Sequence, residues 1–174
     1  MLRGINVGGH NRVSMPDLRA TFEHGGYGNV ATYVQSGNVL FDAPGRQTAS
    51  TLEHSVKALL QDQLGLDVPV LVRSGEELSD VMVTNPFLAE GHDPSQLHVT
   101  FLQTRPTAAA TQALEARDFG AERLAVVGRE VYLLCPGGYG RTKLTPPMLE
   151  RALGATSTTR NWKSVLAIGA LARG

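Results

Sequence analysis

The stretch that decides the fold is Leu2-Arg3-Gly4-Ile5-Asn6-Val7-Gly8-Gly9, at the start of the chain. Apolar and polar positions alternate along it and a glycine pair follows, so the pattern predicts a short first strand that runs into a turn. In the fold expected for the whole chain this strand is central in its sheet, where Arg3 and Asn6 would be costly to bury unless they served a purpose. Arg3 and Asn6 are therefore candidate site residues.

Composition limits the classes of protein that the chain can belong to. Its 174 residues are long enough to form one compact unit or two small lobes, and the formal net charge of zero argues against a polycation built for nucleic acid. The single cysteine, Cys135, excludes an internal disulfide, and no apolar run approaches the roughly 20 residues that span a bilayer. With no signal-peptide pattern at its start, we expect a cytoplasmic protein without a membrane partner.

The order of predicted elements indicates an α+β fold with an internal repeat. The capping box from Ser14 to Asp17, helical spacing that ends at Gly65 and a hairpin turn at 36–38 predict strand, helix, strand, strand, helix, strand over the first 73 residues, with the fourth strand at 68–72. Most of that order is predicted again from Leu97. This is the ferredoxin-like arrangement, so we expect two duplicated ferredoxin-like lobes with antiparallel sheets and a C-terminal helix. The expected lobes are 1–86, which includes a linking helix, and 87–174, together one compact unit.

Four motifs carry a resemblance to a known family. They are the first ten residues after Met1, the run Tyr33-Val34-Gln35-Ser36-Gly37-Asn38-Val39, the run Gly140-Arg141-Thr142-Lys143-Leu144 and the run Thr158-Thr159-Arg160-Asn161-Trp162. Together they resemble the bacterial family catalogued as domain of unknown function 1697 (DUF1697). The resemblance implies cytosolic proteins of two ferredoxin-like lobes and supplies no reaction.

Two of these motifs are candidate anion sites. The glycine-rich segment 137–143 could turn backbone amides toward an anion that Arg141 and Lys143 neutralise, although its spacing is not that of a P-loop, and the alternative is an exposed turn. Arg160, Asn161 and Trp162 stand at the expected start of a helix, where free amides attract negative charge. The alternative there is a capped helix whose tryptophan packs in the core.

A third candidate lies on the hairpin that follows the first helix. Gln35, Ser36 and Asn38 would stand beside the strand that carries Arg3 and Asn6, where amides and hydroxyls could hold a ligand in a fixed orientation. The same residue types are also what tight turns use for their own backbone. Both interpretations stay open from the sequence.

No catalytic or metal-binding pattern is present in the sequence. The five histidines lack metal-ligand spacing, and no hydrolase elbow or carboxylate pair stands out, so catalytic residues are unknown and no metal or cofactor is expected. Three hypotheses remain, in this order. The first is binding of an anionic small molecule or nucleotide in a cleft between the lobes, with or without turnover; the second is binding of single-stranded nucleic acid; the third is a homo-oligomeric interaction module of unknown oligomeric state.

Overall fold

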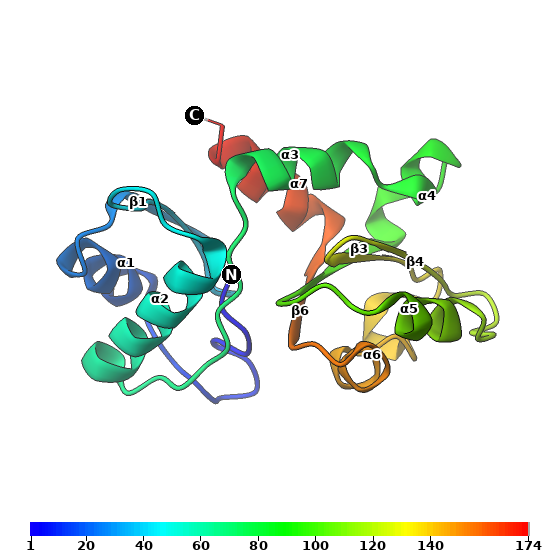
Figure 1. Cartoon of the computed structure of the whole chain (residues 1–174), viewed down its shortest axis with the longest axis horizontal. Helices are drawn as coiled ribbons and strands as arrows, with labels where there is room; N and C mark the ends of the chain where they lie inside the picture. Colours follow the sequence, from blue (N-terminus) through cyan, green and yellow to red (C-terminus); the bar gives the residue numbers. More distant parts are fainter. Residues whose placement is uncertain (174) are drawn as a thin grey trace. The chain divides into compact units, whose positions relative to one another are not determined.

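The computed structural model describes residues 1–173 and shows an α+β protein with two antiparallel sheets (Figure 1). Its contacts divide the chain into two units. Unit 1 is Met1–Ser74 with the C-terminal residues from Ala170, and unit 2 is Gly75–Gly169. The sequence prediction drew the boundary between residues 86 and 87, whereas the contacts group the linking helix with the C-terminal unit.

Unit 1 is built from two helices and a β-hairpin. Its elements are α1 (Met15–His24), β1 (Gly28–Tyr33), β2 (Asn38–Asp42) and α2 (Ala49–Leu64). Ser14 caps α1 as its sequence predicted, because the hydroxyl accepts from the Asp17 amide, and Gly65 ends α2 in the left-handed conformation that glycine tolerates. The strands of the hairpin pair in antiparallel register from Tyr33 opposite Asn38 outward.

The first strand is much shorter in the structure than the sequence predicted. Only one isolated bridge, Leu2 to Val70, remains of the expected pairing between the first and fourth strands, although backbone hydrogen bonds join Arg3 to Pro69 and Leu71 to Met1. After Arg3 the chain leaves the extended conformation because Gly4 and Asn6 both adopt positive φ, at 69° and 56°. Arg3 and Asn6 consequently do not lie in the middle of a sheet, and the fourth strand is likewise reduced to its bridge.

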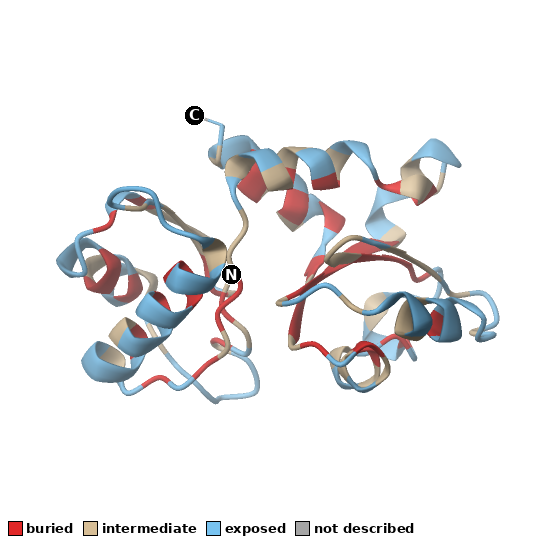
Figure 2. Ribbon diagram, in the orientation of Figure 1, coloured by how far each residue is buried: buried red, intermediate tan, exposed pale blue. Residues whose placement is uncertain are grey.

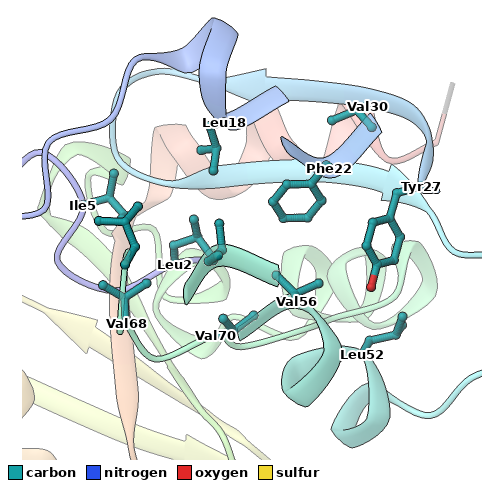
Figure 3. Packing of buried hydrophobic residues seen from close by; sticks show 12 residues of the cluster. Leu2, Ile5, Leu18, Phe22, Tyr27, Val30, Leu52, Val56, Val68 and Val70 are labelled. Carbon is teal, nitrogen blue, oxygen red and sulfur yellow. The ribbon is translucent and has the colours of Figure 1, made fainter. Parts of the chain in front are cut away.

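The core of unit 1 lies between the hairpin, the two helices and the N-terminal segment. Leu18 and Phe22 of α1 point into the same interior as Leu2 and Ile5 (Figure 3). Each of these four side chains is buried, and full burial of one such residue contributes about 1.5–3 kcal/mol relative to exposure. The N-terminal segment is thus held by apolar burial in place of a full strand ladder.

Unit 2 contains a four-stranded sheet flanked by helices. Its elements are α3 (Gly75–Val83), α4 (Pro86–Ala89), η1 (Pro94–Gln96), β3 (Leu97–Leu102), α5 (Ala108–Glu115), β4 (Arg123–Val127), β5 (Glu130–Leu134), η2 (Tyr139–Arg141), α6 (Pro146–Leu153), β6 (Ser157–Asn161) and α7 (Trp162–Leu171). The strand order is β4-β5-β3-β6 and every pairing is antiparallel.

Both faces of this sheet are covered, so all six residues of β3 are buried (Figure 2). On one face Leu102, Val131 and Leu133 pack with Leu149 and Leu153 of α6. Over the other face lie α3 and α7 (Figure 1), and the Tyr132 hydroxyl donates to the carbonyl of Val81 in α3 at 3.2 Å. Burial of β3 on both sides agrees with its four apolar residues, while His98 and Thr100 are polar residues buried within it.

Glutamate side chains accept hydrogen bonds from backbone amides of the two edge strands of the sheet. Glu115 of α5 accepts from the amide of Val126 in β4 at 2.9 Å, and Glu150 of α6 accepts from the amide of Ser157 in β6 at 2.7 Å. Each of these N–H groups is therefore satisfied inside its own unit.

Among residues 1–173, no helix is long and apolar enough to cross a membrane.

Replacement of Gly37 by alanine is expected to destabilise unit 1 by about 2–4 kcal/mol. Gly37 has φ of 75°, and a Cβ there would stand 2.9 Å from the Leu2 Cβ and 3.1 Å from the Leu2 carbonyl oxygen. Gly45→Ala is the matched control, because Gly45 has φ of 67° but nothing within 4 Å. Urea denaturation of both variants separates the steric effect from the conformational one, and equal losses would contradict the packing argument.

Candidate functional site

A polar groove of about 470 Å³ lies within unit 1. Its walls come from the loop before α1, the first turn of α1, the hairpin and the end of α2. The lining residues are Asn6, Gly9, Arg12, Val13, Ser14, Asp17, Gln35 and Leu64. The volume is within the range of small-molecule sites, and its polar side chains make it the candidate site.

The loop that forms one wall is fastened by Asn6. The Asn6 amide nitrogen donates to the carbonyls of Val13 at 2.9 Å and Gln35 at 3.2 Å, and its Oδ1 accepts from the Val13 amide at 2.9 Å. The side-chain amide of Asn11 adds a bond to the Gly4 carbonyl. Because both N–H groups of the Asn6 side chain are donated to backbone oxygens, its role in this structure is to position the groove wall.

Arg12 supplies an exposed guanidinium to the groove. Within residues 1–173 its guanidinium makes no hydrogen bond or ion pair, and a Cβ on Gly9 would lie 3.8 Å from its Nη2 atom. The neighbouring N-terminus of α1 offers few amides, because Asp17 donates to Ser14 Oγ, Leu18 donates to the Ser14 carbonyl and Pro16 has no N–H. The groups that remain available for hydrogen bonding there are therefore mainly side chains.

The hairpin brings Gln35 to the opposite wall. Its backbone carbonyl is held by Asn6, while its side-chain amide has no hydrogen bond within the described part of the chain. The preceding residue, Val34, has φ of 48°, a conformation that is strained for a β-branched side chain and costs about 1–2 kcal/mol. Strain of this kind is concentrated at functional sites in proteins.

Of the other predicted residues of unit 1, Asn38 and Ser36 serve its framework, and Arg3 does not line the groove. Asn38 is buried and donates to the Tyr33 carbonyl and to Ser36 Oγ, which closes the hairpin turn. Arg3 is half-buried, and its backbone amide donates to the Pro69 carbonyl at 3.0 Å. The groove therefore contains Asn6 and Gln35 from the predicted set. Arg12, Ser14 and Asp17 were missed as site residues, and the only sequence signal for them is a cation two residues before a capping box.

The other five predicted residues lie in unit 2. The glycine-rich loop is closed on itself: Arg141 donates through Nε and Nη2 to the Gly137 carbonyl at 3.1 and 2.9 Å, and the amide of Gly138 donates to the Cys135 carbonyl. The amide of Lys143 donates to Glu122. Several amides that an anion would need are thus used by protein acceptors.

Arg160, Asn161 and Trp162 are built into the sheet and the last helix. Arg160 is buried and donates to Thr158 Oγ1 and the Thr159 carbonyl, each at 2.8 Å, and burial lowers the pKa of its guanidinium to about 10. The Asn161 side chain accepts from the Ser164 amide and so caps α7, and Trp162 is buried. The prediction that residues of both units line one cleft stays a prediction.

A stacked pair of buried His98 and half-buried Tyr139 in unit 2 was not foreseen from the sequence. The rings of His98 and Tyr139 stack with centroids 4.4 Å apart and planes 18° apart. His98 Nδ1 and the Tyr139 hydroxyl are buried without a hydrogen-bond partner in the structure. Burial lowers the pKa of His98 and raises the pKa of Tyr139, so both are held neutral.

Metal chemistry finds no support in the described residues, which contain no group of three histidine, cysteine or acidic side chains able to hold an ion. Cys135 is a buried free thiol whose pKa is raised by burial, the opposite of what an activated nucleophile requires.

The fold and groove together define an α+β protein of two units that carries a polar groove in the first. The chain belongs to the family described as protein of unknown function (DUF1697), whose model matches residues 1–132. The family is the one that the sequence motifs predicted, and the match includes the first two of the four motifs. Its fold is similar to that of the conserved bacterial protein SP0830 from Streptococcus pneumoniae, with a TM-score of 0.77 and 20% identity over 100% of this chain and 96% of that one. Among curated proteins none matches the chain.

Asn6→Asp is expected to destabilise unit 1 by about 1–3 kcal/mol, because it places a carboxylate against the carbonyl oxygens of Val13 and Gln35. Asn11→Asp, which removes only the bond to Gly4, is the matched control and should cost less. Chemical denaturation measures both. A smaller loss for Asn6→Asp than for Asn11→Asp would contradict the assigned role of Asn6.

The free energy of unfolding is expected to fall as the pH drops below about 6.5, the ordinary pKa of histidine. The His98 pKa is depressed in the folded state, so the unfolded chain binds a proton more readily, and stability is present above the ordinary pKa and lost as the pH falls through the folded one. His98→Phe keeps an aromatic ring beside Tyr139 without titration and should flatten this dependence. Identical pH profiles of the two proteins in urea denaturation would exclude His98 as its source.

Proposed function

We propose that unit 1 binds a small molecule with an anionic group, such as a phosphorylated or nucleotide-type metabolite, in the groove beside α1. The observation that carries the proposal is the Arg12 guanidinium, which faces a groove of about 470 Å³ and has no partner among residues 1–173. A guanidinium that no protein acceptor binds is suited to a charge-assisted hydrogen bond with an anion.

The surroundings of Arg12 support the same proposal. The groove wall is fixed in advance by Asn6, so little conformational entropy is lost when a ligand binds. The free side-chain amide of Gln35 provides a neutral donor and acceptor, and Val34 stores strain beside it. Val13 and Leu64 give the groove two aliphatic surfaces, as in other small-molecule sites.

Titration with inorganic phosphate and a nucleoside monophosphate, followed by amide NMR shifts, tests the proposal. Arg12→Gln is expected to weaken binding about tenfold or more, because it removes the charge that faces the anion. Arg46→Gln is the matched control, since Arg46 is an exposed arginine of unit 1 that does not line the groove, and it should change affinity less than about twofold. Equal binding by the Arg12→Gln variant and the unchanged protein would refute the proposal.

Two further measurements test the other two functions predicted from the sequence. Binding of a single-stranded oligonucleotide that declines steeply with salt would favour nucleic-acid binding. A molecular mass that rises with protein concentration would favour a homo-oligomeric module. Among the described residues, no observation favours nucleic-acid binding or oligomerisation over small-molecule binding in the groove. We therefore place both functions after small-molecule binding.

We also propose an origin for the topology of unit 1 and a location for the protein. Unit 1 is proposed to be a reduced copy of the β-α-β-β-α-β unit, since segment 1–3, α1, β1, β2, α2 and segment 69–71 follow each other in the same chain order as β3, α5, β4, β5, α6 and β6. Cytoplasmic location is supported by the one cysteine of the chain, Cys135, which is buried as a free thiol.

A further inference from the structure

The groove of unit 1 contains a fixed negative charge as well as Arg12. Asp17 stands in the first turn of α1, and its Oδ2 accepts from the Ser14 hydroxyl at 2.6 Å while its amide donates back to that hydroxyl at 3.1 Å. This reciprocal pair holds the carboxylate against the helix end. Asp17 Oδ1 accepts no hydrogen bond from the described residues, so it remains open to a ligand.

The two charges of the groove sum to zero, which limits the ligands that it favours. A ligand with only negative charge gains from Arg12 and is repelled by Asp17, which lines the same groove. A ligand that also carries a positive group satisfies both side chains and is itself neutral overall. Charge complementarity of this kind determines specificity more than affinity.

The uncharged lining indicates what should connect the two groups of such a ligand. Val13 and Leu64 are half-buried aliphatic residues of the groove, and the amide of Gln35 is its free neutral polar group. Resting on the proposed function of the groove, we infer that its ligand is a zwitterion, with an acidic group on Arg12 and an ammonium group on Asp17, joined by an aliphatic segment along Val13 and Leu64.

The test uses ω-amino carboxylates with two to about seven methylene groups, each paired with the alkyl carboxylate of the same length. Amide NMR titration of the full chain gives the affinity of each probe. One length of the series is expected to bind about tenfold more tightly than its alkyl partner, because the ammonium group adds a charge-assisted bond to Asp17. If the ammonium group brings no gain at any length, the inference is overturned.

Variants of Asp17 supply a second readout that a purely structural role would not produce. Asp17→Asn should abolish the gain from the ammonium group and at the same time strengthen the binding of inorganic phosphate severalfold, because the repulsion is removed. Glu23→Gln is the matched control on α1, since Glu23 pairs with Arg19 and does not line the groove; it should change neither value. Parallel changes in both probes on Asp17→Asn contradict the inference.

The outcomes distinguish the two proposals. Phosphate binding that depends on Arg12, together with no ammonium gain in the unchanged protein, leaves the proposed function standing and overturns the zwitterion inference. Loss of any Arg12 dependence for phosphate and for the zwitterions refutes both. The comparison of paired probes in the unchanged protein decides the inference even if the Asp17 variant fails to fold.

Discussion

The close approach of Gly37 to Leu2 is the contact on which unit 1 depends. The Leu2 amide donates to the Gly37 carbonyl at 2.7 Å, and the absence of a side chain at Gly37 lets the hairpin turn rest on the N-terminal segment. Leu2 and Ile5 are thereby delivered to the core, and the loop that follows is brought beside Gln35. The groove exists because these two segments, distant in sequence, meet at a glycine.

Local signals were sufficient to predict many of the elements. The capping pair of Ser14 and Asp17, the left-handed end of α2 at Gly65 and the hairpin turn around Gly37 each involve residues close together in sequence, and each is present in the structure. In unit 2, short-range signals likewise predicted β3, α5, β4, β5 and α6. They missed β6, because Arg160 and Asn161 were expected at the start of a helix and instead end a strand. Family membership was predicted from motifs spread along the chain, and the family model confirms it.

What the sequence could not supply depends on backbone conformation and on distant contacts. An alternating pattern does not disclose that Gly4 and Asn6 adopt positive φ, and these two conformations replace the expected strand with the wall of a groove. The grouping of Arg12 with Gln35 and Leu64 requires three remote parts of the chain to meet. Conversely, Arg141 and Asn161 resembled ligand-binding residues because the same polar side chains close turns and cap helices, which is how both are used.

The carboxylates at the edges of the unit 2 sheet have a consequence for how this chain behaves in a crowded solution. An edge strand with open amides is a template on which another chain can add a strand. Glu115 at β4 and Glu150 at β6 each occupy one such amide and set a negative charge beside it, so an incoming strand loses a hydrogen bond and brings its carbonyl oxygens toward a carboxylate. At these two positions the carboxylates therefore disfavour the addition of a further strand to either edge of the sheet.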